Sequence, residues 1–174
     1  LTSFEKKTGK RGVMISAVDL LKGIAVGASM KNITVAGANG GLHTNYQGKG
    51  QAAVKALVEE DYDFAYIHIE APDEMGHQGS VEHKIQAIEA IDHFVVQTVV
   101  KGLEAAKEDY RLLILPDHPT PIRLRTHTGD PVPFMLYDSR APRQECWQYN
   151  EREAQLSQDY VEAGHKLIDI LLEI

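Results

Sequence analysis

Short apolar runs alternate with longer amphipathic stretches along most of this 174-residue chain. Continuous apolar runs, typical of strands inside a parallel sheet, occupy residues 12–16, 33–36, 64–69, 111–115 and 133–137. Apolar residues at helical spacing predict helices over 18–26, from Thr44 or Asn45 to about Val58, over 80–106 and over 158–174. Strands that alternate with helices predict an α/β fold, with a mostly parallel sheet flanked by helices on both faces.

The two longest predicted helices each have an apolar face. In residues 80–106 that face comprises Val81, Ile85, Ile88, Val95, Val99 and Leu103, and Ser80 can cap the first turn. In residues 158–174 it comprises Ala163, Leu167, Ile170, Leu171 and Ile174. Residues 138–150 show neither helical nor strand periodicity, which predicts an irregular segment.

Length, charge and cysteine content exclude several classes of protein. The length fits one domain with a substantial core. The net charge of −7 argues against a nucleic-acid partner, because a phosphate backbone requires a basic face. Cys146 is the single cysteine, so an internal disulfide is excluded, and we expect an inert thiol in a cytoplasmic protein. No apolar stretch is long enough to cross a bilayer, so we expect no membrane partner.

Two acid–histidine clusters stand at metal-ligand spacing, each just after an apolar run. Asp73 and His77 are four residues apart, which places both on one side of a helical turn. Asp117 and His118 are adjacent between two prolines, and His127 follows in a polar loop. In open α/β sheets, ligand sites form beyond the carboxyl ends of strands. The sequence therefore predicts a metal centre at this edge of the sheet.

The donor set leaves several arrangements open. Asp117 and His118 could serve two different ions or flank a single one. Asp73 could instead cap a helix beside a surface His77, and His127 could be a solvated loop histidine. Mixed carboxylate and imidazole ligands suit manganese, zinc or iron better than magnesium or calcium.

Three cations are candidates for contact with an anionic substrate. Lys22 lies inside an otherwise apolar stretch, where it could meet the substrate or be a surface lysine on an amphipathic helix. Arg123 and Arg125 flank the loop before His127 and could bind a phosphate bidentately or face solvent.

Several of these stretches together resemble one known family. The chain is similar to the cofactor-independent phosphoglycerate mutases, in particular their archaeal-type branch, which belongs to the alkaline phosphatase superfamily. The similarity covers about residues 12–138. The stretches that carry it are SAVDLLKGI (16–24), TNYQGKG (44–50), YIHIEAPDEMGHQG (66–79), LPDHPTPIRLRTHT (115–128) and DPVPFMLYDS (130–139).

The resemblance implies a site with two divalent ions, manganese or zinc. By motif, Asp73, His77 and His127 resemble the ligands of one ion, and Asp117 and His118 resemble half the ligands of the other. In the family, an aspartate and a nucleophilic serine near the N-terminus complete the second site. The reaction interconverts 3-phosphoglycerate and 2-phosphoglycerate in glycolysis through a phosphoserine, so a small phosphorylated substrate is the implied partner.

The first residue is leucine, and no serine of this chain stands in the family's nucleophile context. We therefore expect residues 1–174 to be the C-terminal part of an alkaline-phosphatase-like domain whose N-terminal strands are missing. Such a chain would form at most one good metal site, would be inert alone and could self-associate through exposed apolar surface. The alternatives are another phosphotransferase of the superfamily, such as a proposed homoserine kinase, a phosphatase of the superfamily, or a non-enzymatic metal-binding or interaction domain.

Overall fold

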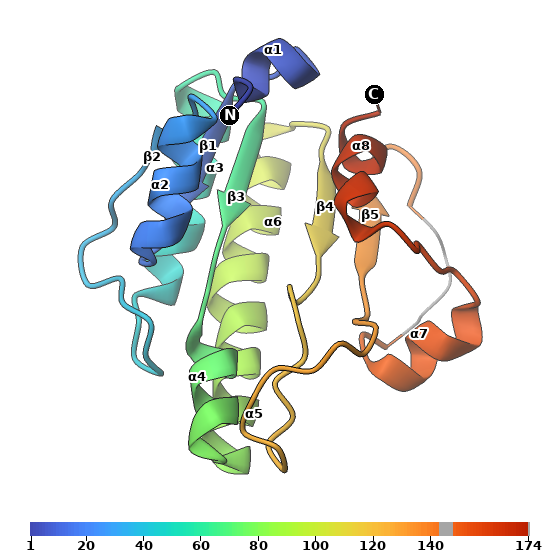
Figure 1. Ribbon diagram of the computed structural model, residues 1–174. Coiled ribbons are helices and arrows are strands. Elements are labelled where there is room, and N and C mark those ends of the chain that lie inside the picture. Colours follow the sequence, from blue (N-terminus) through green and yellow to red (C-terminus); the bar gives the residue numbers. More distant parts are fainter. Residues whose placement is uncertain (143–147, 174) are drawn as a thin grey trace. The chain divides into compact units, whose positions relative to one another are not determined.

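The computed structural model describes residues 1–142 and 148–173 (Figure 1). The chain divides into two compact units, each with its own sheet. Unit 1 comprises residues 1–108 and 120–126, and unit 2 comprises residues 109–119 and 127–174. Cys146 lies outside the described residues, so its predicted inertness stays a prediction.

Unit 1 is built on a three-stranded parallel sheet in the order β2-β1-β3. Its strands are β1 (Gly12–Ile15), β2 (Lys31–Asn32) and β3 (Phe64–Ile67). All four residues of β1 are buried, as expected for a central strand covered on both faces. The predicted strands over 12–16 and 64–69 are confirmed, each slightly shorter than expected.

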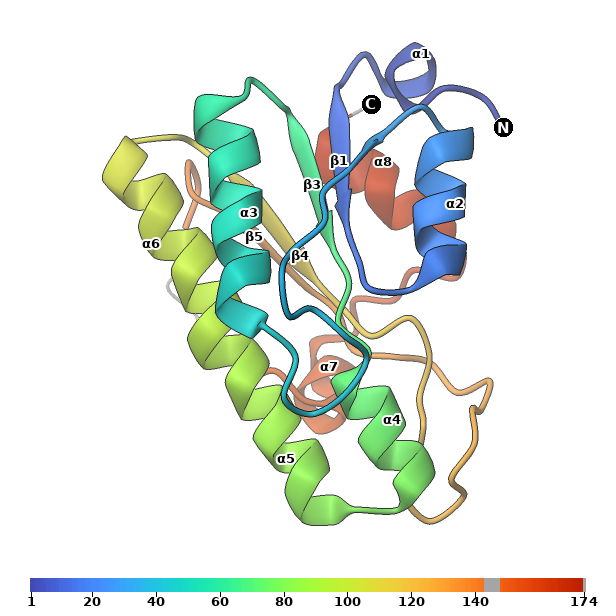
Figure 2. The ribbon, with the colours of Figure 1, turned by 90° about the vertical axis from the view of Figure 1, so that its left-hand side faces the viewer.

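Helices cover both faces of this sheet, as the alternating pattern predicts. Figure 2 shows α2 (Asp19–Gly27) on one side of the strands and α3 (Tyr46–Glu59) on the other, with α6 (Gln97–Ala106) beside α3. Asn45 caps α3 by accepting a hydrogen bond from Gly48 N at 2.9 Å, and Ser80 caps α5 by accepting from His83 N. The helices of unit 1 are α1 (Phe4–Thr8), α2 (Asp19–Gly27), α3 (Tyr46–Glu59), α4 (Ala71–Gln78), α5 (Val81–Ala90) and α6 (Gln97–Ala106).

The long helix predicted over 80–106 is present but contains a π-helical segment, Ile91–Val96, between α5 and α6. One extra residue in a helix rotates everything after it by about 100°. Val95, Val99 and Leu103 are buried as predicted, whereas Val81, Ile85 and Ile88 are exposed. The single apolar face predicted along this helix is therefore wrong for its first half, where Ala87 is buried instead.

The strand predicted over 33–36 is wrong. Ile33 N donates to Met14 O at 2.9 Å, but pairing ends there and β2 covers only Lys31–Asn32. The backbone beyond it is bonded within its own loop, where the Asn45 side chain donates to Ala36 O at 2.9 Å. The apolar run is thus part of a loop that leads into the capped start of α3.

Unit 2 contains an antiparallel pair, β4 (Arg111–Ile114) and β5 (Met135–Asp138). Both strands were predicted, and their antiparallel pairing departs from the parallel order of unit 1. Arg111 Nε donates to Asp138 Oδ2 at 2.8 Å across the pair. Among the described residues, no helix is long and apolar enough to cross a membrane.

The single helix predicted over 158–174 is wrong. Its place is taken by a short 3-10 turn, Gly164–Lys166, and by α8 (Leu167–Leu172). An unexpected helix, α7 (Glu151–Ser157), precedes them and is capped by Asn150, whose side chain accepts from Glu153 N at 2.9 Å. Gln158 adopts a left-handed conformation that ends α7, which is why the apolar residues that follow do not continue it.

Candidate metal centre

Asp73 and His77 lie on α4, which begins directly beyond the carboxyl end of β3 (Figure 1). Pro72 stands in the first turn, where its missing N–H costs no hydrogen bond. The two side chains are one helical turn apart, and His77 Nε2 lies 3.4 Å from Asp73 Oδ1. The spacing predicted from sequence is therefore realised, and both donors face the same place.

The His77 ring is oriented through its other nitrogen. His77 Nδ1 lies 2.9 Å from the carbonyl oxygen of Arg125. A carbonyl only accepts, so this bond assigns the proton to Nδ1 and leaves the ring's lone pair on Nε2. Metal-binding histidines usually have this second partner, which fixes both tautomer and orientation.

Asp73 is oriented by a chain of two further hydrogen bonds. The Thr120 hydroxyl donates to Asp73 Oδ1. Thr120 is almost wholly buried, and its carbonyl accepts from Lys84 Nζ at 2.8 Å. Neither contact has a signal in the sequence, because Thr120 is 47 residues from Asp73 and Lys84 is 36 residues from Thr120.

Two glycines allow segment 120–126 to lie against α4. A Cβ at Gly76 would lie 2.7 Å from Thr120 O, closer than real Cβ atoms approach. At Gly79, which has φ +73° and ends α4, a Cβ would lie 2.5 Å from Arg125 Nε. The segment that orients both candidate ligands therefore depends on bare backbone at Gly76, where its neighbour is a carbonyl, whereas Gly79 is required by its left-handed backbone.

Unit 2 gathers the other three predicted ligands. Asp117 and His118 follow β4, with 3.4 Å between Asp117 Oδ2 and His118 Nε2. The His118 and His127 rings lie 3.7 Å apart between centroids. Thr128 N donates to Pro119 O at 3.1 Å, which closes the loop that carries both rings. The structure thus describes an Asp73–His77 pair in unit 1 and an Asp117–His118–His127 cluster in unit 2.

The predicted substrate-contacting cations are all accessible. Lys22 lies on α2, with Nζ 3.1 Å from Asp19 Oδ1 in an exposed i,i+3 pair. Arg123 and Arg125 are exposed on the segment that follows Thr120. Nothing in these positions tests a role in catalysis or substrate binding, and those roles stay predictions.

Lys49 is a feature that sequence reasoning did not identify. Its side chain is fully buried, and Nζ donates to His68 O at 2.8 Å and lies 3.5 Å from Glu70 Oε2. Burial lowers the pKa of Lys49, and the Glu70 carboxylate opposes that change. The sequence did not reveal this burial, because a single lysine on an amphipathic helix is normally expected to face solvent.

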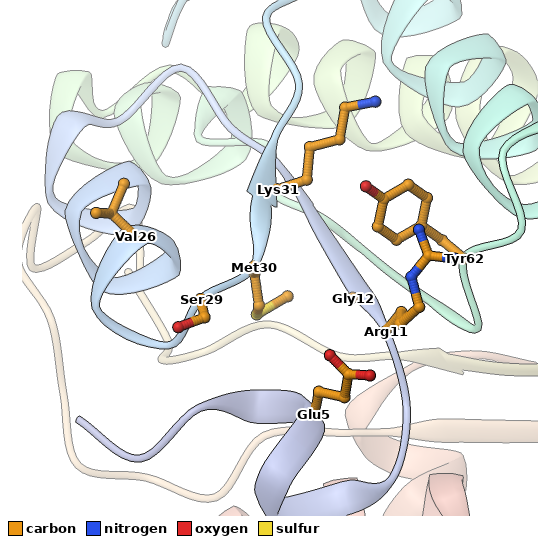
Figure 3. Close-up of a pocket in the computed structure, with 8 residues that line it drawn as sticks. All are labelled: Glu5, Arg11, Gly12, Val26, Ser29, Met30, Lys31 and Tyr62. Carbon is orange, nitrogen blue, oxygen red and sulfur yellow. The ribbon is translucent and has the colours of Figure 1, made fainter.

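Unit 1 also has a pocket of about 360 Å³ near the amino ends of β1 and β2 (Figure 3). Arg11 Cζ lies 4.5 Å from the centre of the Tyr62 ring, and Lys31 Nζ lies 2.6 Å from Glu60 Oε2. Two of the charged side chains that line the pocket, Arg11 and Lys31, therefore have partners in the protein. The pocket is at the opposite end of the strands from α4, so it is not part of the candidate metal centre.

Comparisons with known proteins agree with a metal-dependent enzyme. A family model described as the Metalloenzyme superfamily matches residues 1–165. A 2,3-bisphosphoglycerate-independent phosphoglycerate mutase of Methanosarcina acetivorans is 47% identical over 152 residues, covering 87% of this chain and 38% of that protein. A probable enzyme of the same name from Geobacter sulfurreducens is 45% identical over 174 residues, covering 99% of this chain and 43% of that protein.

A solved structure shows the same fold. The PH0037 protein from Pyrococcus horikoshii matches with a TM-score of 0.85 and 27% identity, covering 99% of this chain and 51% of that one. The chain spans about two fifths of the length of the two relatives above (38% and 43%).

Proposed function

Because the chain belongs to the metalloenzyme superfamily, we propose that it forms part of the metal centre of a cofactor-independent phosphoglycerate mutase. The names of the relatives support this activity, as do the two groups of carboxylate and imidazole donors. The observation that carries the proposal is the Asp73–His77 pair, in which each side chain is oriented by a separate hydrogen bond. Such orientation is characteristic of metal ligands.

We assign Asp73, His77 and His127 to one divalent ion. Only Thr126 separates His127 from Arg125, so chain connectivity keeps His127 close to the carbonyl that binds His77. One carboxylate and two imidazoles suit manganese or zinc. Asp117 and His118 would give half the ligands of a second ion, and the resemblance to the family implies an aspartate and a nucleophilic serine for the other half.

In the complete enzyme, the ions would neutralise charge on the attacking and leaving oxygens during phosphoryl transfer. This chain's part is to hold donors in fixed positions and to bind the substrate's phosphate. Arg123 and Arg125 present exposed guanidinium groups that suit bidentate phosphate contacts. Lys22 would stabilise negative charge on the substrate if its ammonium group left the exposed Asp19 carboxylate and paired with the substrate instead. Without a nucleophilic serine, the chain alone should not interconvert 3-phosphoglycerate and 2-phosphoglycerate.

Metal titration tests the ligand assignment. Mn²⁺ or Zn²⁺ is titrated into the chain, into His77→Ala and into His83→Ala, a control that removes an exposed imidazole from the neighbouring helix α5. We expect one site in the chain and in the His83 variant, and its loss in the His77 variant. Equal binding by all three proteins would contradict the assignment. Two tight sites in the unaltered chain would show that it forms a more complete centre than we propose.

The activity requires a separate assay. A full-length relative that contains this region should interconvert the phosphoglycerates, and substitution of its residue at the position of His77 should abolish that activity. Phosphorylation of homoserine instead would assign the other phosphotransferase activity. Self-association and a cytoplasmic location also stay predictions.

A further inference from the structure

We propose that Lys49 is a positioning residue for the metal ligands on α4, acting through Glu70. The inference rests on the proposed function, because it concerns how the chain prepares Asp73 and His77 for an ion. The partners of Lys49 Nζ are His68 O and Glu70 Oε2 rather than Asp73 or His77, so we assign it neither a ligand nor a catalytic role.

The Lys49 ammonium joins three elements of unit 1. Lys49 belongs to α3, His68 lies just past the end of β3, and Glu70 precedes the first residue of α4. Nζ donates to His68 O at 2.8 Å and contacts Glu70 Oε2 at 3.5 Å. Because the Lys49 side chain has no exposed surface, its charge is compensated by these groups rather than by water.

Glu70 connects this cation to the metal ligands. It occupies the N-cap position of α4, but its side chain makes no capping bond. Its carbonyl accepts from Asp73 N at 2.9 Å and from Glu74 N at 3.1 Å, which begins the helix. The side chain of Glu70 therefore faces Lys49 while its backbone sets the first turn that carries Asp73. Loss of Lys49 should let that turn shift.

The same cluster does not form a serine–histidine–acid triad. Ser16 Oγ and Glu70 Oε2 both approach the same ring nitrogen, His68 Nδ1, at 3.5 and 3.8 Å. A triad needs its acid and its nucleophile on opposite nitrogens. In addition, Ser16 Oγ accepts from Val18 N at 3.0 Å. Structural support of α4 is the role that these contacts favour.

An electrostatic effect and a positioning effect would change the metal affinity of a Lys49 variant in opposite directions. Replacing the lysine by a neutral residue makes the neighbourhood of α4 more negative, so electrostatics alone would tighten cation binding. A positioning role predicts weaker binding, because the carboxylate and imidazole would no longer be held at the same spacing. Loss of oriented support around metal ligands typically weakens metal affinity about 10-fold or more.

The experiment measures Mn²⁺ affinity from the free-ion spin-resonance signal, for the whole chain and its variants. The test variant is Lys49→Met, and the matched control is Lys55→Met, an exposed lysine on the same helix. Titrations are run well below the unfolding temperature of each metal-free variant, so that only folded protein is compared. The double variant Lys49→Met/Glu70→Gln removes both charges of the pair and leaves the net charge unchanged, so no uncompensated buried charge remains to oppose folding.

We expect the dissociation constant to rise about 10-fold in Lys49→Met and to rise in the double variant as well, with no change in Lys55→Met. Unchanged or tighter binding in both Lys49 variants would overturn the proposal. A lower unfolding temperature with unchanged affinity would assign Lys49 a purely structural role, which also overturns it.

A metal-free measurement separates this inference from the ligand assignment. The tautomer of His77 is read from its imidazole ¹⁵N shifts in the metal-free chain. We expect the Nδ1–H form in the unaltered chain and a mixture of tautomers in Lys49→Met, because a shifted α4 loses the bond to Arg125 O. An unchanged tautomer would overturn the positioning role even if His77→Ala bound Mn²⁺ normally and the ligand assignment had failed.

Discussion

Replacing Gly76 by alanine should destabilise unit 1, although alanine is the better helix former. Gly76 lies inside α4, where segment 120–126 lies against the helix. A methyl group there would lie 2.7 Å from Thr120 O and 2.9 Å from Lys84 Nζ. These two atoms form a hydrogen bond with each other, so the new methyl group would force both to move.

The magnitude follows from two opposing terms. Overpacking at a close contact costs about 1–3 kcal/mol, and a backbone carbonyl gives way less easily than the end of a flexible side chain. Greater helix propensity returns about 1 kcal/mol. The difference between the two terms is a net loss of about 0–2 kcal/mol in the free energy of unfolding, and we expect the upper half of that range because the close contact is with a backbone carbonyl. In a chain of this size each kcal/mol lowers the unfolding temperature by about 2–4 °C.

The assay is urea unfolding, followed by circular dichroism, with Gly23→Ala as the control. Gly23 is also inside a helix, α2, but a Cβ there would meet no atom within 4 Å. Only the propensity term applies, so that variant should gain up to about 1 kcal/mol. The two glycine substitutions should therefore change stability in opposite directions.

The result that would refute this reasoning is equal stabilisation by both substitutions. It would mean that segment 120–126 does not lie against Gly76 closely enough to exclude a methyl group. The oriented environment of Asp73 would then lose its structural basis, because Thr120 belongs to the same segment.

Three further outcomes are expected. Thr120→Val removes the hydroxyl that orients Asp73 at nearly constant volume, and it should weaken Mn²⁺ binding about 10-fold in a titration of the folded chain. Asn45→Ala removes the cap of α3 and should lower the free energy of unfolding by about 1 kcal/mol, measured in urea. Arg140, by its side-chain and backbone hydrogen bonds, holds the pKa of Asp138 far below its usual range. A depressed carboxyl pKa stabilises the fold above the unfolded-state value of about 4, and this contribution is lost as the pH falls toward the folded-state value. Asp138→Asn should therefore be less stable at pH 7, and less sensitive to acid between about pH 4 and 2, in urea midpoints followed by pH.

The sequence predicted those features that depend on local spacing. The pairing of Asp73 with His77 needs only a helical turn, and the strands β1 and β3 need only short apolar runs. Ser80, and Asn45 as one of two candidates with Thr44, were likewise predicted as caps from residue type beside an apolar pattern. These predictions hold because neighbouring residues alone determine them.

The features that the sequence did not predict depend on distant contacts. Thr120 reaches Asp73 across 47 positions, and Lys49 reaches Glu70 across 21, so no local pattern reveals either bond. The apolar run 33–36 matches a strand in composition, but its backbone is bonded by a loop that includes Asn45. The final helix is shorter than predicted, because residues 158–163 form no helix and helical structure resumes only at Gly164.

The π-helical segment Ile91–Val96 has a consequence for how this region can change over evolution. Helix α5, before it, packs on α4, while α6, after it, packs on α3. A relative that had lost one residue within the segment would turn one half of the helix by about 100° with respect to the other. Its buried and exposed positions would have to be exchanged throughout that half. The extra residue should therefore be inherited together with the apolar pattern of one entire half, rather than gained or lost by itself.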